Sequence, residues 1–262
     1  MAVVLSSGLG GAHAGELGNT HARSLSKVEK KSSLIKLLNQ PMDNYFWVSR
    51  KEGKFETGNK ESFYIKKIDK QRMTYDISNN EVLVNLRYDG SLRCMNFYDS
   101  TVSIAHKAAL AGLYTSSSNL IMSGELQYNI RIGETLFDLS KVDWPLKTGY
   151  LKGTIPQTCY EVDGLSVKLV AFAPISEDGK ETPRLGVYGI SLENISKGPI
   201  NGSIVFPTLK GKDQSHPNSA SISLKYKYED RDVSGNEISF NLSSGENLWA
   251  STIVLPNDNT ED

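Results

Sequence analysis

The stretch from Asp76 to Asp99 constrains the fold more than any other part of this 262-residue chain. It contains two segments in which side-chain character alternates, Glu81–Tyr88 and Ser91–Tyr98, and Asp89-Gly90 separates them. A period of two residues on both sides of an Asp-Gly pair is the strongest local signal for a β-hairpin. The sequence therefore predicts two antiparallel strands joined by a tight turn in this stretch.

A second Asp-Gly pair, Asp163-Gly164, predicts another hairpin between the segments Lys152–Val162 and Leu165–Ala173. In a strand, successive side chains point to opposite faces of the sheet. The second segment would therefore separate two sets of residues: Val167, Leu169 and Ala171 on one face, and Lys168, Val170 and Phe172 on the other.

Most of the chain after residue 41 consists of short blocks rich in Val, Ile, Tyr, Phe and Thr, separated by Gly, Asn, Asp and Pro. We count about fourteen strand candidates, at the spacing typical of sandwiches and barrels. The predicted fold class is all-β: one large antiparallel β-sandwich of two face-to-face sheets, with a short N-terminal helix. Besides the hairpins, the strand candidates are Ser62–Ile68, Arg72–Ile77, Asn119–Met122, Leu126–Ile132, Glu134–Leu139, Arg184–Glu193, Ile200–Leu209, Ser219–Tyr228, Glu237–Leu242 and Leu248–Leu255.

Composition divides the chain into three regions. Residues 1–40 combine a Gly-, Ala- and Ser-rich tail with Ser24–Asn39, where apolar spacing and a capping box predict a short amphipathic helix. Residues 41–256 form the predicted sandwich domain, and residues 257–262 form an acidic tail. Val3–Leu5 is too short for the apolar part of a signal peptide, and no Lys or Arg precedes it, so we expect a cytoplasmic location rather than secretion.

Charge and composition argue against several classes of partner. Lys and Arg number 29 and Asp and Glu number 30, so the net charge of −1 gives no electrostatic reason to expect a nucleic acid or an anionic membrane. No apolar run approaches the roughly 20 residues of a membrane-spanning helix. The two cysteines, Cys94 and Cys159, are expected as buried free thiols, and one bridge between them is the alternative in an oxidising compartment.

The sequence contains no motif that indicates catalysis or a cofactor. It lacks a Gly-rich phosphate loop, a paired-Cys zinc pattern, an HExxH motif and a G-x-S-x-G nucleophile elbow. We therefore predict no catalytic residue, no metal site and no cofactor. Acids such as Asp99, Glu125 and Asp143 could pair as the acid and base of a glycosidase, but solvated loop acids are the simpler interpretation.

The candidate binding residues are aromatic residues and the acids beside them. Flat rings stack on the faces of sugars, and adjacent polar side chains bind the hydroxyl groups. The pairs Tyr98-Asp99 and Asp143-Trp144 combine both features, and Tyr45 and Trp47 lie in an aromatic block. The alternative for each of them is packing in a core or anchoring an interface.

Three parts of the chain together resemble the N-terminal β-supersandwich domain of bacterial glucoamylases and of related enzymes similar to cellobiose phosphorylase. ISNNEVLVNLRYDGSLRCMNFYD resembles the opening hairpin of that domain. Tyr160–Leu209, with YEVDGLSVKLVAFAP, GVYGISLENIS and INGSIVFPTLKG, resembles its later part, and LSSGENLWASTIVL resembles its closing turn and strand. The resemblance covers residues 72–256 and rests on turns and alternation rather than on a catalytic signature.

In that superfamily, two stacked antiparallel sheets are followed by an (α/α)6 barrel that carries the general-acid and general-base carboxylates. No part of this chain is similar to the barrel. The resemblance therefore implies a non-catalytic β-sandwich subunit or module of a glycoside hydrolase-like or phosphorylase-like enzyme, docked on a separate (α/α)6-barrel chain and active only with it. The alternatives are a free-standing module that binds oligosaccharides, and a structural or assembly protein, including a homo-oligomer, that binds no sugar.

Overall fold

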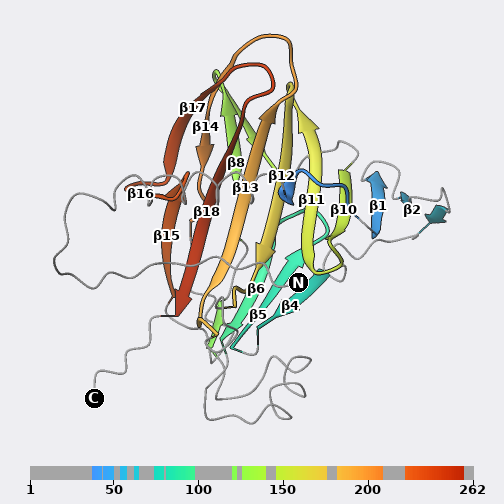
Figure 1. The fold of residues 1–262 in the computed structure, drawn as a ribbon, viewed down its shortest axis with the longest axis vertical. Coiled ribbons are helices and arrows are strands. Elements are labelled where there is room, and N and C mark those ends of the chain that lie inside the picture. Colours follow the sequence, from blue (N-terminus) through green and yellow to red (C-terminus); the bar gives the residue numbers. More distant parts are fainter. Residues whose placement is uncertain are drawn as a thin grey trace, which may run out of the picture.

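The structure is a computed structural model that describes residues 37–42, 44–49, 54–57, 62–64, 74–79, 81–97, 120–122, 126–139, 146–175, 182–208 and 222–256. These residues are nearly all β, with eighteen strands in three antiparallel sheets (Figure 1). Within these ranges only Leu37 and Leu38 have helical geometry, and no helix is long and apolar enough to cross a membrane. All but the last three residues of the predicted helix Ser24–Asn39 lie outside the described residues.

The largest sheet has ten strands. They are β1 (Asn44–Ser49), β2 (Lys54–Thr57), β3 (Ser62–Tyr64), β10 (Leu146–Leu151), β11 (Ile155–Val162), β12 (Leu165–Phe172), β13 (Gly186–Asn194), β15 (Ile222–Tyr228), β16 (Arg231–Val233) and β18 (Asn247–Pro256). Their order across the sheet is β16-β15-β18-β13-β12-β11-β10-β1-β2-β3, which runs from left to right in Figure 1.

Two smaller sheets have four strands each. The first, which we call the β5 sheet, contains β4 (Thr74–Ser78), β5 (Val82–Arg87), β6 (Leu92–Phe97) and β7 (Leu120–Met122) in that order. The second, the β14 sheet, has the order β17-β14-β8-β9 and contains β8 (Asn129–Ile132), β9 (Thr135–Asp138), β14 (Ile200–Val205) and β17 (Glu237–Leu242). In Figure 1 the β5 sheet lies near the lower end of the large sheet, and β8, β14 and β17 lie near its upper end.

Both small sheets pack on one face of the large sheet, which we call its inner face. One continuous core contains buried side chains from all three sheets, among them Leu86 of β5, Ile130 of β8 and Leu169 of β12. This layered packing is consistent with the predicted β-sandwich. The expected second sheet, however, is divided into two sheets of four strands. Twist accumulates from strand to strand in a wide sheet, so one continuous layer does not easily cover ten strands.

The hairpin predicted around Asp89-Gly90 is confirmed as β5 and β6, but its turn is buried. The Tyr188 hydroxyl donates a 2.6 Å hydrogen bond to the Gly90 carbonyl, and the Thr158 hydroxyl donates a 3.1 Å bond to the Tyr88 carbonyl. Both donors belong to the large sheet. Buried carbonyl groups need such partners, so the large sheet stabilises a turn that is shielded from water.

The second predicted hairpin is confirmed as β11 and β12. Asp163 and Gly164 have φ angles of 47° and 82°, and positive φ at both positions is what a tight hairpin turn of type I′ requires. The two predicted residue sets of β12 also separate. Val167, Leu169 and Ala171 lie in the inner core, whereas Val170 and Phe172 belong to a second cluster on the outer face.

The outer face of the large sheet has its own apolar cluster over part of its area. It contains Leu151, Ile155, Val170, Phe172, Val187 and Trp249, together with Leu38 from the segment of residues 37–42. Leu38 and Met42 are 1% and 5% exposed, and the Gln157 amide donates a 3.2 Å hydrogen bond to the Leu38 carbonyl. Residues 37–42 therefore cover one part of this face. Trp249 of β18 is buried here, on the outer side.

Four strands were not predicted from the sequence. One of them is β1, which contains the aromatic block Asn44–Val48. β2 lies in a segment without clear alternation, and the alternation in β10 is weakened by Gly149. The sequence predicts a turn over Asp230–Gly235. The structure instead places β16 inside this segment, where it pairs with β15. The prediction of a turn for all of this segment was wrong, because a short edge strand is formed by its partner rather than by its own sequence.

Candidate functional site

The structure describes two of the six predicted binding residues, and both are in β1. Tyr45 pairs with Gly149 of β10, and Trp47 pairs with Lys147. Residues two apart in a strand share a face, so these positions belong to one side of the sheet. Trp47 is described only in its backbone, and Tyr98, Asp99, Asp143 and Trp144 lie outside the described residues. A sugar-binding role for the six residues thus stays a prediction.

The Tyr45 ring lies against a lysine. The Lys147 ammonium nitrogen is 3.7 Å from the centroid of the Tyr45 ring, which is the geometry of a cation–π contact. The ammonium group covers one face of the ring. A sugar can therefore stack only on the opposite face of Tyr45.

Lys147 begins a row of polar residues across the outer face. Cys159 of β11 lies directly between Lys147 of β10 and Lys168 of β12 in the strand register. Lys168 donates a hydrogen bond to the Asn39 side-chain carbonyl and forms an ion pair at 3.8 Å with Glu193 of β13. This row lies beside the apolar cluster and gives the outer face a charged part.

Cys159 is a free thiol whose surroundings oppose ionisation. Desolvation raises its pKa to about 11, although Lys168 and Lys147 act in the opposite direction. A thiol with this pKa is almost completely protonated at neutral pH, and the thiolate is the reactive form. Cys159 is therefore unsuited to act as a nucleophile.

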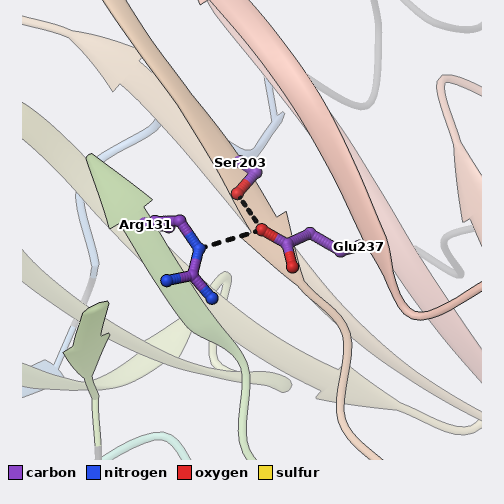
Figure 2. A network of polar contacts seen from close by, with 3 residues as sticks. All are labelled: Arg131, Ser203 and Glu237. Atoms are coloured by element: carbon purple, nitrogen blue, oxygen red, sulfur yellow. Dashed lines mark hydrogen bonds and ion pairs between the residues drawn. The ribbon is translucent and has the colours of Figure 1, made fainter. Parts of the chain in front are cut away.

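A second polar arrangement lies on the β14 sheet (Figure 2). One carboxylate oxygen of Glu237 accepts hydrogen bonds from the Ser203 hydroxyl and, at 3.1 Å, from Arg131 Nε. The Ser203 hydrogen bond and then the Arg131 guanidinium lower the pKa of Glu237. The Arg131 and Glu237 side chains are 40% and 41% exposed.

Each residue of this network comes from a different strand, namely β8, β14 and β17. Glycoside hydrolysis requires two carboxylic groups on opposite sides of the scissile bond, and the network holds one carboxylate that is stabilised as an anion. The network is therefore a set of polar contacts that link three strands at the surface. Among the described residues, no three His, Cys, Asp or Glu side chains are grouped in a way that would hold a metal ion.

The sequence interpretation missed Lys147 and Lys168 as neighbours of the candidate residues. Lys147 was missed because β10 was not predicted. The alternation of Leu146, Thr148 and Tyr150 with other residues was the available signal, since all three contact or approach the inner core. The position of Lys168 beside Cys159 depends on strand register, which the sequence does not show.

Comparison with known proteins gives no identification of the chain: no protein-family model matches it, and no curated protein sequence matches it at a significant level.

Proposed function

We propose that this chain is a non-catalytic β-supersandwich module of a carbohydrate-active enzyme of the glycoside hydrolase or phosphorylase type. In this proposal it docks on a chain with an (α/α)6 barrel, and the barrel holds the general acid and the general base. The module stabilises the barrel and contributes a loop to the rim of its active site.

One observation carries the proposal: the segments that resemble the supersandwich domain are neighbours in space. YEVDGLSVKLVAFAP, GVYGISLENIS and LSSGENLWASTIVL contribute β11, β12, β13 and β18, which are four adjacent strands at the centre of the large sheet. The segment ISNNEVLVNLRYDGSLRCMNFYD contributes β5 and β6, and β5 packs on β12. Parts of the chain that are far apart in sequence and resemble one domain thus belong to one packed unit.

The layering also supports the proposal. A ten-stranded sheet with a second layer on its inner face is the kind of stacked, large-sheet architecture that the resemblance implies. The competing idea of a free-standing module that stacks sugars on Tyr45 is less well supported, because Lys147 already covers one face of that ring.

The test is to isolate the tagged full-length protein from its natural host after mild crosslinking and to identify its partners by mass spectrometry. We expect equimolar recovery of a chain with a helical barrel, and cleavage or phosphorolysis of oligosaccharides by the complex but not by this chain alone. Replacing an acidic catalytic residue of the barrel by its amide should abolish the activity, whereas Glu237→Gln in this chain should leave it unchanged. Activity of this chain alone, or purification without any barrel chain, would contradict the proposal.

A further inference from the structure

A shallow hollow of about 380 Å³ lies where the ends of β15, β17 and β18 meet. These strands belong to two different sheets and lie on the left side of the molecule in Figure 1. The residues that line the hollow are Tyr228, Glu229, Asn241, Leu242, Gly245, Glu246, Asn247 and Leu248.

Polar atoms form most of the surface of the hollow, and two buried leucines lie beneath it. Leu242 of β17 and Leu248 of β18 are 5% and 1% exposed and belong to the inner core, so the hollow opens at the end of the space between the two layers. Asn241 and Glu246 are exposed at the rim. A concave surface with several hydrogen-bonding groups suits a polar small molecule.

The turns beside the hollow are held in place by Asn194, which is fully buried. Its side-chain amide donates 2.8 Å hydrogen bonds to the carbonyl groups of Gly198 and Leu242. Its backbone carbonyl accepts a 2.8 Å bond from the amide of Gly245, and its own amide donates a 2.9 Å bond to the carbonyl of Glu246. The backbone of three lining residues, Leu242, Gly245 and Glu246, is thus fixed before any ligand binds, which lowers the entropic cost of binding.

The lining selects the chemical class of ligand. Carboxylate and amide groups, here Glu229, Glu246, Asn241 and Asn247, form hydrogen bonds with hydroxyl groups, and the Tyr228 ring offers an apolar surface. Two carboxylates in one hollow repel anionic ligands. The volume fits about one or two sugar rings, since small-ligand pockets begin at about 300 Å³.

We propose that this hollow binds the end of a neutral oligosaccharide. The choice of ligand class rests on the proposed function, in which the chain belongs to a carbohydrate-active enzyme. The hollow then holds substrate on the sandwich module itself.

The test is an NMR titration of the full chain with cellobiose and, separately, with maltose, in which backbone amide shifts are followed. We expect saturable shifts at Gly245, Glu246 and Asn247 with at least one of the two sugars. Asn241→Ala should raise the Kd at least about fivefold, as expected for the loss of one hydrogen bond. Asn201→Ala is the matched control, because Asn201 pairs with Asn241 on the neighbouring strand but does not line the hollow, and its Kd should be unchanged.

A second pair of variants protects the test against misfolding of Asn241→Ala. Glu229→Gln keeps the shape of the rim and should also weaken sugar binding, whereas Glu161→Gln, on an exposed position of β11, should not. Absence of saturable shifts, or equal Kd values for the variants and their controls, would overturn the inference. So would saturable binding of CaCl2 at the same amides without any binding of sugar. Recovery of the barrel complex without sugar binding here would remove this inference and leave the proposed function intact.

Discussion

Gly90 has a backbone conformation and a position that together admit only glycine. Its φ angle is 82°, and a Cβ atom on it would lie 2.6 Å from Leu169 Cδ1 and 3.2 Å from Thr158 Cβ. The strain of a positive φ and the overlap with the core add together. We expect Gly90→Ala to lower the free energy of unfolding by about 2–4 kcal/mol, measured by urea denaturation.

Gly133 is the matched control for this prediction. Its φ angle is 58°, and a Cβ atom there would meet nothing within 4 Å. Gly133→Ala therefore carries only the conformational strain and should lower the free energy of unfolding by about 1 kcal/mol. Equal losses for the two variants would mean that the turn around Gly90 does not pack on β12 as described.

Cys159 provides a prediction about reactivity. Since its pKa is raised to about 11, the thiolate fraction at pH 8 is about a hundredfold smaller than that of an ordinary thiol. In a Cys94→Ser background, we expect Cys159 of the folded protein to react with a disulfide reagent at least about a hundredfold more slowly than in urea. The folded-state rate should rise steadily up to about pH 11. Rapid reaction at pH 8 would show that the thiol is accessible and ionised.

At the scale of elements, Asn194 joins the end of β13 to two turns. Its side chain makes four hydrogen bonds, two as donor to Gly198 and Leu242 and two as acceptor from the amide and hydroxyl of Ser196. Asn194→Ala removes all four hydrogen bonds, including the buried one to the Leu242 carbonyl, so we expect a loss of about 2–4 kcal/mol in the free energy of unfolding. The exposed Asn201→Ala should change it by no more than about 0.5 kcal/mol, as thermal or urea denaturation can show. Comparable losses would contradict the central role of Asn194.

Local sequence predicted the elements where the pattern and the tertiary structure agree. The Asp-Gly hairpins and the last strand followed from alternation and turn chemistry alone, because these are local properties. β16 could not be predicted in this way, because its residues form a strand only through pairing with β15. The burial of the turn at Gly90 was equally beyond the sequence, because Tyr188 and Thr158, which satisfy it, are distant along the chain.

In the candidate site, too, some features follow from local sequence and others depend on tertiary structure. An aromatic block was sufficient to select Tyr45, but its contact with Lys147 depends on the register between β1 and β10. Likewise, the hollow is lined by the ends of strands from two sheets, and no local pattern records which strand ends meet. Residue type therefore indicated the kind of chemistry, whereas the packing of sheets decides where that chemistry is assembled.

At the scale of the whole molecule, Tyr188 is the point where the three sheets are joined. It lies in β13 of the large sheet, and its hydroxyl bonds the Gly90 carbonyl in the hairpin of the β5 sheet. Its backbone carbonyl accepts a 2.9 Å hydrogen bond from Tyr128, which precedes β8 of the β14 sheet and also bonds Thr252 of β18 at 2.8 Å. Desolvation raises the pKa of both buried tyrosines well above the ordinary value of 10.

These two tyrosines should make the fold sensitive to alkali. Below pH 10 they are protonated in both the folded and the unfolded chain, and the full stability is present. Above pH 10 the unfolded chain releases their protons while the folded chain retains them, so rising pH favours unfolding. Each tyrosine should then lower the free energy of unfolding by about 1.4 kcal/mol per pH unit.

Two variants separate this effect from simple loss of stability. Tyr128→Phe removes one titrating group and should reduce the alkaline slope by about 1.4 kcal/mol per pH unit, as measured by urea denaturation between pH 9 and pH 12. Thr252→Val removes a hydrogen bond to the same hydroxyl but no titrating group, so it should lower stability and leave the slope unchanged. The prediction fails if Tyr128→Phe keeps the slope of the unaltered chain. Tyrosinate absorbance that appears before unfolding would then place Tyr128 in contact with solvent. In that case the three sheets are not joined through a shielded pair of tyrosines. The single core described for the three sheets would have to be treated as separate cores.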